Sequence, residues 1–195
     1  MTFEELKFEI LDRQRKKEIS KLFHLYVKAE TYRDILAIVK SEGNFRWILK
    51  NGFRDLIQYF PVEDLEIEGF YDREVELSDM STDIIILSNG ILNLSQTGNK
   101  RCRVICDGGR LNITQNDFSM VEIECYERSL VYMTANSYSY GYITTRDQSS
   151  VSITGNDNTT FVLYGFGNSY SSAELQPNSY VNYKLEDQAR FNFII

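Results

Sequence analysis

The chain has 195 residues, of which 43% are hydrophobic and 25% charged, and its net charge is −7. This composition is typical of a folded protein and excludes a disordered chain. No stretch approaches the roughly 18 uninterrupted apolar residues of a membrane span, and Met1 to Lys7 lacks the basic and apolar regions of a signal peptide. We therefore expect a cytoplasmic protein that makes no membrane contact.

Apolar residues recur at helical spacing through the first third of the chain. They predict one long helix or two over residues 3–30, a helix from Tyr32 to Ser41 with Thr31 as its N-cap, and short helices at 44–49 and 53–59. Residues 1–61 are therefore expected to form a helical cap region. The first of these segments carries a basic run on its exposed side: Arg13, Arg15, Lys16 and Lys17.

Negative charge is concentrated in residues 55–80, which carry nine acidic side chains against one arginine. Leu65, Ile67, Val75 and Leu77 alternate with acidic residues around Gly69. The alternation predicts two short strands and an irregular first coil over 62–82. Such a patch favours charge-guided contact with a basic partner. Its candidate contact residues are Glu63, Asp64, Glu66, Glu68, Glu74 and Glu76.

The rest of the chain is repetitive. The stretch 90–96, Gly-Ile-Leu-Asn-Leu-Ser-Gln, is echoed at 109–115, 129–135 and 149–155. Steps of 19, 20, 20, 22 and 18 residues separate the equivalent points Leu92, Leu111, Val131, Val151, Ala173 and Phe191. A near-constant period of about 20 residues is typical of a solenoid. We predict an α+β protein in which residues 62–195 form a right-handed, single-stranded parallel β-helix.

The same register predicts two columns of equivalent residues. The side chain two positions before each point is small, as a tight bend requires. The residues five positions after it predict a ladder of side-chain amides: Thr97, Asn116, Asn136, Asn156 and Asn178.

The cysteines and the single histidine favour no metal or cofactor. Cys102, Cys106 and Cys125 are an odd number in a chain without a signal peptide, which favours reduced thiols in the core. His24 is alone, whereas a zinc site needs about four ligands. A histidine-dependent catalytic arrangement would have to use this one residue on an amphipathic helix.

A likeness to known proteins is carried by the helical block from Thr31 to Pro61, the strand pair at Tyr71 to Leu77, and the coils from Ile84 onward. With these features the chain resembles short proteins of bacterial mobile elements and prophages, which join a helical segment to β-helix coils. The resemblance implies the same fold and a mobile-element origin. No catalytic motif comes with it.

An acidic column is predicted four residues before each equivalent point, at Ser88, Asp107, Glu127, Asp147, Ser169 and Asp187. Carboxylates about 5 Å apart on neighbouring coils would suit a cation, a glycosidase pair or the imitation of a phosphate row. The alternative is that acidic residues suit solvent-facing turns. Asp107, Glu127 and Asp147 are the candidates for contact with a partner.

Two further surfaces are candidates for binding. Alternation along the strands predicts an outer face rich in tyrosine, although cross-strand packing explains the same pattern; its candidates are Tyr132, Tyr138, Tyr140, Tyr164 and Tyr170. An apolar coil end without a second cap favours self-association as a homodimer; its candidates are Phe191, Phe193, Ile194 and Ile195.

These patterns favour a non-enzymatic protein that binds a macromolecule. The preferred hypothesis is a phage or mobile-element protein that docks on a host protein through acidic and tyrosine-rich faces, for example as an inhibitor of a nucleic-acid-handling defence enzyme. One alternative is a virion or surface component that binds glycan or self-assembles, and another is a carbohydrate-active β-helix enzyme. Direct contact with nucleic acid through the basic run is a weaker option.

Overall fold

The computed structural model describes residues 1–17, 22–41, 54–81 and 84–194. They divide into two compact units, Met1–Phe70 and Tyr71–Ile195. The helix expected at 44–49 and the candidate Ile195 lie outside the described residues. In the described ranges, none of the helices has the length and apolar character needed to cross a bilayer.

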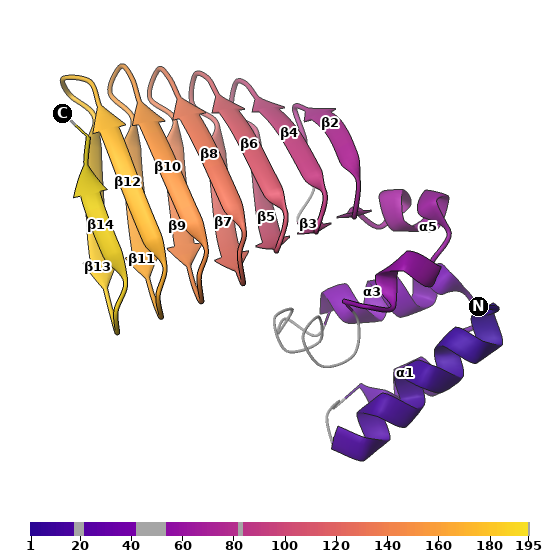
Figure 1. Cartoon of the computed structure of the whole chain (residues 1–195). Coiled ribbons are helices and arrows are strands. Elements are labelled where there is room, and N and C mark those ends of the chain that lie inside the picture. Colours follow the sequence, from indigo (N-terminus) through magenta and orange to yellow (C-terminus); the bar gives the residue numbers. More distant parts are fainter. Residues whose placement is uncertain (18–21, 42–53, 82–83, 195) are drawn as a thin grey trace. The chain divides into compact units, whose positions relative to one another are not determined.

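The first unit is helical (Figure 1). Its elements are α1 (Phe3–Lys17), α2 (Phe23–Lys28), α3 (Tyr32–Ser41), the 3-10 helix η2 (Ile57–Tyr59) and α5 (Val62–Ile67). The segment 3–30 thus forms two helices. The predicted bounds of α3 are confirmed, and so is its cap: the Asp34 N–H donates to Thr31 Oγ1 (3.1 Å), while the Thr31 N–H donates to Asp34 Oδ2 (2.8 Å).

The strand predicted around Leu65 and Ile67 is wrong, because these residues belong to helix α5. Pro61 precedes the helix, and Glu63 and Asp64 lie in its first turn, where negative charge stabilises a helix N-terminus. Alternation over only four residues could not distinguish the two structures. Leu65 is buried and Ile67 is 61% exposed, so the helix buries only one of the two apolar residues.

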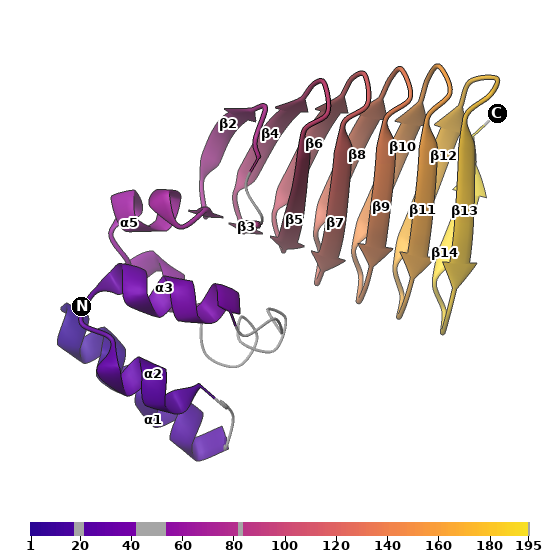
Figure 2. The ribbon, with the colours of Figure 1, turned by 180° about the vertical axis from the view of Figure 1, so that it is seen from behind.

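The second unit is a parallel β-solenoid, as predicted (Figures 1 and 2). Over the described residues, odd-numbered strands form one seven-stranded sheet, called sheet A, and even-numbered strands form another, called sheet B. Sheet A contains β1 (Phe70–Tyr71), β3 (Ile85–Ser88), β5 (Arg101–Asp107), β7 (Met120–Tyr126), β9 (Tyr140–Thr145), β11 (Thr160–Gly165) and β13 (Tyr180–Leu185). Sheet B contains β2 (Glu74–Ser78), β4 (Ile91–Gln96), β6 (Arg110–Gln115), β8 (Leu130–Ala135), β10 (Ser150–Gly155), β12 (Tyr170–Leu175) and β14 (Arg190–Phe193).

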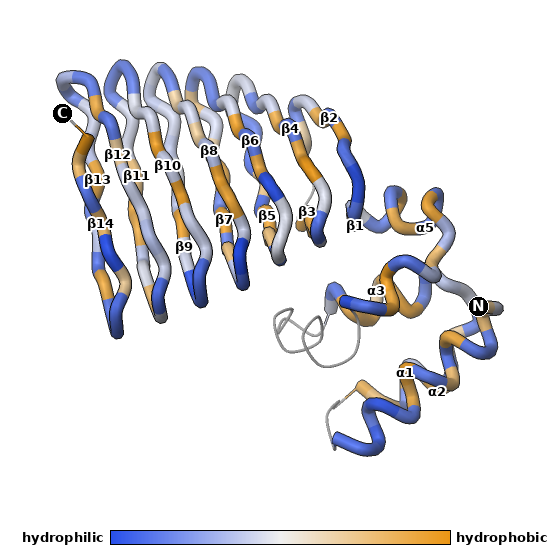
Figure 3. The backbone as a smooth tube through the Cα atoms, viewed as in Figure 1, coloured by the Kyte–Doolittle hydropathy of each residue, from blue (hydrophilic) through white to orange (hydrophobic). Residues whose placement is uncertain are grey.

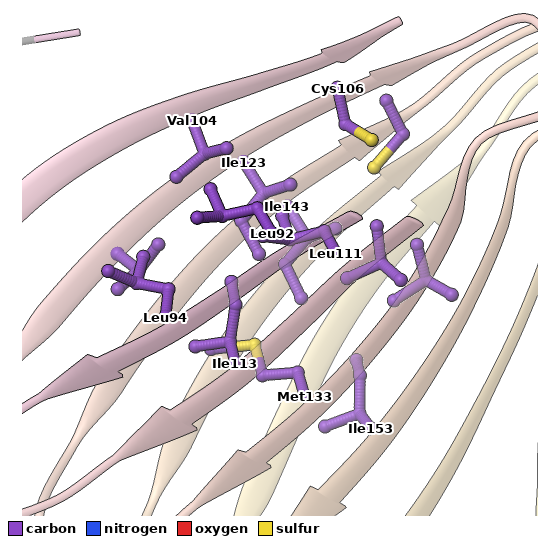
Figure 4. Packing of buried hydrophobic residues seen from close by; sticks show 14 of the residues in the cluster. Leu92, Leu94, Val104, Cys106, Leu111, Ile113, Ile123, Met133, Ile143 and Ile153 are labelled. Carbon is purple, nitrogen blue, oxygen red and sulfur yellow. The ribbon is translucent and has the colours of Figure 1, made fainter. Parts of the chain in front are cut away.

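Alternate residues of each strand point between the two sheets and form the core. Leu92, Leu111 and Val131 pair in register across β4, β6 and β8, and Ile123 pairs with Ile143 across β7 and β9. Figure 3 shows the resulting alternation of hydropathy along the strands, and Figure 4 shows the aliphatic side chains packed between them. Val75 of β2 pairs with Leu92, so the β2 part of the predicted first coil belongs to the solenoid, whereas residues 62–67 form helix α5 of the first unit.

The repeat is more regular than the sequence analysis predicts. Val151 pairs with Ser171, and Ser171 with Phe191, so the equivalent point is Ser171 and not Ala173. Its side chain is 1% exposed, and a buried serine escapes a search for apolar residues. From β6 to β14 each strand begins ten residues after the one before it. Each coil is therefore two similar half-coils.

Both predicted columns exist in corrected form. The small residues at the bend are Gly90, Gly109, Ser129, Ser149, Ser169 and Ala189, with Ser169 in place of Ser171. In the amide ladder Asn136 Nδ2 donates to Asn116 Oδ1 (2.9 Å), and Asn156 Nδ2 donates to Asn136 Oδ1 (2.9 Å). The corrected register puts Gln176 at the next rung, so Asn178 is not part of the ladder. The capping role of the helices and the hand of the solenoid stay predictions.

We expect the three thiols to be unreactive in the folded protein. All three cysteines are buried and reduced, and Cys106 pairs with Cys125 as predicted. Burial raises the pKa of Cys102, raises the pKa of Cys106 to about 11, and raises the pKa of Cys125 well above its ordinary value. Because the thiolate is the reactive form, Ellman's reagent at pH about 8 should label no thiol until denaturant is added. Labelling of the native protein at the rate of free cysteine would contradict this.

Candidate functional site

The tyrosine candidates do not form the single face that the sequence predicts. Tyr132 and Tyr170 lie on the outer surface of sheet B, whereas Tyr140 and Tyr164 lie on the outer surface of sheet A. Tyr138 lies in the turn after β8, where its ring stacks on Phe118 at 5.6 Å. Consecutive strands of a two-sheet coil belong to opposite sheets, so residues close in sequence are divided between opposite surfaces.

The acidic column is also wrong as predicted. In the register between β5 and β7, Asp107 lies opposite Tyr126 and not opposite Glu127. The Asp107 side chain is only 2% exposed. The residues that share the corner with Glu127 are Gly108, Asp147, Gly167 and Asp187, all with left-handed φ values between 55° and 85°. Glycine thus occupies two of these five positions, so the acidic residues do not follow one another on every coil. The three carboxylates Asp107, Glu127 and Asp147 do not make the continuous row that a cation site or a glycosidase pair would need.

The carboxylates at this corner hold the turns together. Asp147 Oδ2 accepts a hydrogen bond from the Glu127 N–H (3.2 Å), and Asp187 Oδ2 accepts one from the Gly167 N–H (3.1 Å). Among the described residues, no group of three or more histidine, cysteine, aspartate or glutamate side chains could hold a metal ion. The interpretation of these residues as turn formers therefore fits the structure better.

The basic run is largely engaged within the helical unit. Arg13 Nε lies 2.7 Å from Glu9 Oε1, and its Nη1 lies 2.7 Å from Asp55 Oδ1, which lowers the pKa of the Asp55 carboxyl. Lys16 Nζ lies 2.5 Å from Asp12 Oδ2. The Arg15 guanidinium lies over the Phe23 ring at 5.3 Å, and Lys17 also has a partner. These contacts weaken the case for direct nucleic-acid binding here.

The acidic candidates belong to both units. Glu63, Asp64 and Glu66 lie on α5, and Glu68 follows it, whereas Glu74 and Glu76 are exposed on β2 of the solenoid. Glu63 is exposed as well. Glu68 is largely buried and pairs with Arg33 (3.4 Å) and Lys40 (3.6 Å). The predicted acidic run is thus divided between the helical unit and the solenoid unit.

Asp64 and Glu68 line a groove of about 600 Å³ in the helical unit, which we call the acidic groove. The other lining residues come from α1, from α3 and from the segment before α3: Phe3, Glu30, Thr31, Tyr32, Arg33, Asp34 and Ala37. Four carboxylates face one guanidinium in this lining. Lys40 also pairs with Glu68, so the groove keeps a net negative charge that comes mainly from Glu30, Asp34 and Asp64.

The four carboxylates of the acidic groove are not equivalent. Asp34 Oδ2 accepts hydrogen bonds from the N–H groups of Glu30 (2.9 Å) and Thr31 (2.8 Å), and these contacts lower the pKa of Asp34. Glu68 is held by its two basic neighbours. Within the described ranges, the carboxylates of Glu30 and Asp64 make no ion pair or hydrogen bond. These two are available to a ligand.

An aromatic group forms one side of the acidic groove. The centroid of the Tyr32 ring lies 5.3 Å from the ring centroid of Phe3 and 5.7 Å from that of Phe60, and both contacts are edge-on. These contacts fix the ring in place while it lines the groove. A fixed aromatic ring beside free carboxylates attracts cations through its face as well as by charge. The arrangement suits an ammonium or guanidinium group.

A second groove, of about 500 Å³, crosses the outer surface of sheet B over β2, β4 and β6. We call it the polar groove and define it by six side chains: Glu76, Ser78, Asn93, Ser95, Asn112 and Thr114. Of these six residues, the sequence predicts only Glu76 as a candidate for contact with a partner. The echo between 90–96 and 109–115 contains the signal, since the polar residue that follows each inward apolar residue is of the same type in both copies: Asn93 and Asn112, and Ser95 and Thr114.

Two carboxylates on the outer surface of sheet A are also paired. Glu122 Oε1 lies 3.4 Å from Arg103 Nε, and Glu124 forms an ion pair with the same guanidinium. The Tyr126 hydroxyl donates to Glu124 as well. Both carboxylates are therefore engaged by one guanidinium on the surface of the sheet.

The last coil leaves part of its apolar interior exposed. Phe193 is 55% exposed, Ile194 50% and Tyr183 46%. The Phe191 ring stacks on Tyr183 at 4.5 Å, and β13 and β14 are the edge strands of sheets A and B. Self-association through Phe191, Phe193 and Ile194 stays a prediction.

Comparisons with models of protein families, with curated proteins and with solved structures find no match to this chain. The fold and the two grooves define a β-solenoid protein with a helical unit and one candidate binding groove in each unit.

Proposed function

We propose that this chain is a binding protein, without chemistry of its own, that captures lysine or arginine side chains of a partner protein in the acidic groove. The observation that carries the proposal is the pair of free carboxylates, Glu30 and Asp64, beside the fixed ring of Tyr32. A negative groove steers a basic surface towards it, and the aromatic ring then contacts the cation at close range.

The charge of the groove favours a protein partner over a nucleic acid. Phosphate groups would be repelled by its carboxylates, whereas binding of nucleic acid needs lysine and arginine. The narrower proposal, drawn from the mobile-element resemblance, is that the partner is a basic nucleic-acid-handling enzyme of the host. Such enzymes present the lysine and arginine side chains that the acidic groove would bind.

The test is binding of a defined arginine- and lysine-rich peptide, measured by isothermal titration calorimetry at low salt. We expect the double variant Glu30→Gln/Asp64→Asn to bind about tenfold more weakly. Each exposed ion pair contributes up to about 1 kcal/mol, and about 1.4 kcal/mol corresponds to tenfold in affinity. Affinity of the unchanged protein should fall as salt is raised.

The matched control is Glu4→Gln/Glu63→Gln. These two residues are exposed on α1 and α5 and do not line the groove, yet their replacement changes the net charge by the same amount. The control should bind within about twofold of the unchanged protein, a difference below about 0.5 kcal/mol. Equal weakening in both variants would show unspecific charge attraction and reject the proposal.

A further inference from the structure

The polar groove is built from two straight rows of side chains that cross three coils. Glu76, Asn93 and Asn112 pair in register and form the first row, and Ser78, Ser95 and Thr114 form the second. Neighbouring coils are about 4.8 Å apart. The groove therefore presents carboxylate, amide and hydroxyl groups at regular intervals along the solenoid axis.

The hydrogen bonds of the first row leave a mixed set of free groups. Arg110 Nε donates to Asn112 Oδ1 (3.3 Å), and Asn112 Nδ2 donates to Asn93 Oδ1 (2.7 Å). Among the described residues, nothing pairs with the Glu76 carboxylate, the Asn93 amide N–H groups, or the hydroxyls of Ser78, Ser95 and Thr114. Donors and acceptors are thus both available, and the amide pair is fixed in orientation.

An aromatic ring continues the first row on the next coil. Tyr132 pairs with Asn112, is 46% exposed, and has the Arg110 guanidinium over its ring at 4.9 Å. The same arginine therefore orients both the amide pair and the ring. A tyrosine ring combines a large apolar face with a polar edge.

We propose that the polar groove binds a neutral oligosaccharide that lies along the solenoid axis, with its rings over β2, β4 and β6 and one end against Tyr132. Sugar hydroxyls both donate and accept hydrogen bonds, as the hydroxyls and amides of the groove do. The apolar C–H face of a sugar ring suits the tyrosine ring. Glu76 and the absence of a free cation among the six groove residues disfavour an anionic glycan.

This site is independent of the acidic groove. It lies in the other unit and takes a ligand of another class. From Glu76 to Tyr132 the first row spans four coils, about 14 Å at the spacing of strands in a sheet. A tetrasaccharide is therefore long enough to reach both ends of the row.

The test uses the full chain and neutral β-linked tetrasaccharides of glucose, galactose and N-acetylglucosamine, with binding followed by isothermal titration calorimetry. At least one tetrasaccharide should bind at millimolar concentration or below. We expect Tyr132→Ala and Asn93→Ala each to weaken it about tenfold. The control Tyr180→Ala makes the same change on the opposite sheet, at a ring that is 65% exposed, and should leave affinity unchanged.

Two results would overturn the proposal. One is that none of the tetrasaccharides binds. The other is that Tyr132→Ala and Tyr180→Ala alter the affinity alike, which would mean that any exposed tyrosine suffices. Neither result would affect peptide capture by Glu30 and Asp64, so failure here and failure of the proposed function are distinguishable. Circular dichroism and the urea midpoint would show that each variant keeps its fold.

Discussion

Replacing Gly90 with alanine is expected to destabilise the solenoid by about 3 kcal/mol or more. A Cβ atom added at Gly90 would lie 2.5 Å from the Arg73 carbonyl oxygen, 2.6 Å from the Arg73 nitrogen and 2.8 Å from the Asp72 carbonyl carbon. All three atoms belong to the backbone of the preceding coil, so no side-chain rotation relieves the overlap. Accommodation would have to separate two coils that are hydrogen-bonded through Ile91 and Arg73.

The matched control for this prediction is Gly98→Ala. Gly98 lies in a turn with φ of +60°, and nothing lies within 4 Å of an added Cβ atom. The cost there is only that of a left-handed conformation, about 1 kcal/mol. Urea unfolding with an unchanged m-value gives both free energies. A loss at Gly90 no larger than that at Gly98 would contradict the close approach of the coils.

The periodicity of the chain predicts the solenoid well, because inward residues must be apolar or small on every coil. The register is less predictable where the interior accepts a polar residue. Ser171 is such a residue, and the neighbouring Ala173 is the more apolar choice, so the predicted equivalent points shift by two there. The columns derived from them shift as well, so the small residue at that bend is Ser169 and not Ser171, and the rung of the amide ladder is Gln176 and not Asn178.

The candidate sites depend on tertiary contacts that no linear pattern contains. Asp64 and Glu68 stand out as part of an acidic run, but the acidic groove also needs Phe3, Glu30 and Tyr32, which the folding of the helices brings beside them. Pairing also removes candidates that a charge count retains, as with Arg13 and its two carboxylates. The local sequence thus indicates the charge of a surface but not which groups remain free.

Replacing both Gly141 and Phe161 with valine should cost about 2 kcal/mol less than the sum of the two single replacements. Phe161 is fully buried and pairs with Gly141 in register. A Cβ atom at Gly141 would lie 2.7 Å from Phe161 Cδ1 and 2.8 Å from Met133 Cε. The ring therefore fills space that a side chain at position 141 would otherwise occupy, while the adjacent coils carry Val121 and Val181 in the same column.

Each single variant is expected to lose about 3 kcal/mol: Phe161→Val because it leaves a cavity, and Gly141→Val because it overpacks the core. In the double variant the new methyl groups occupy the space of the lost ring, and the column becomes valine on four consecutive coils. A double-mutant cycle measured by urea unfolding should show a favourable coupling of about 2 kcal/mol. Additive losses would contradict it, since they would mean that the two side chains do not share one volume.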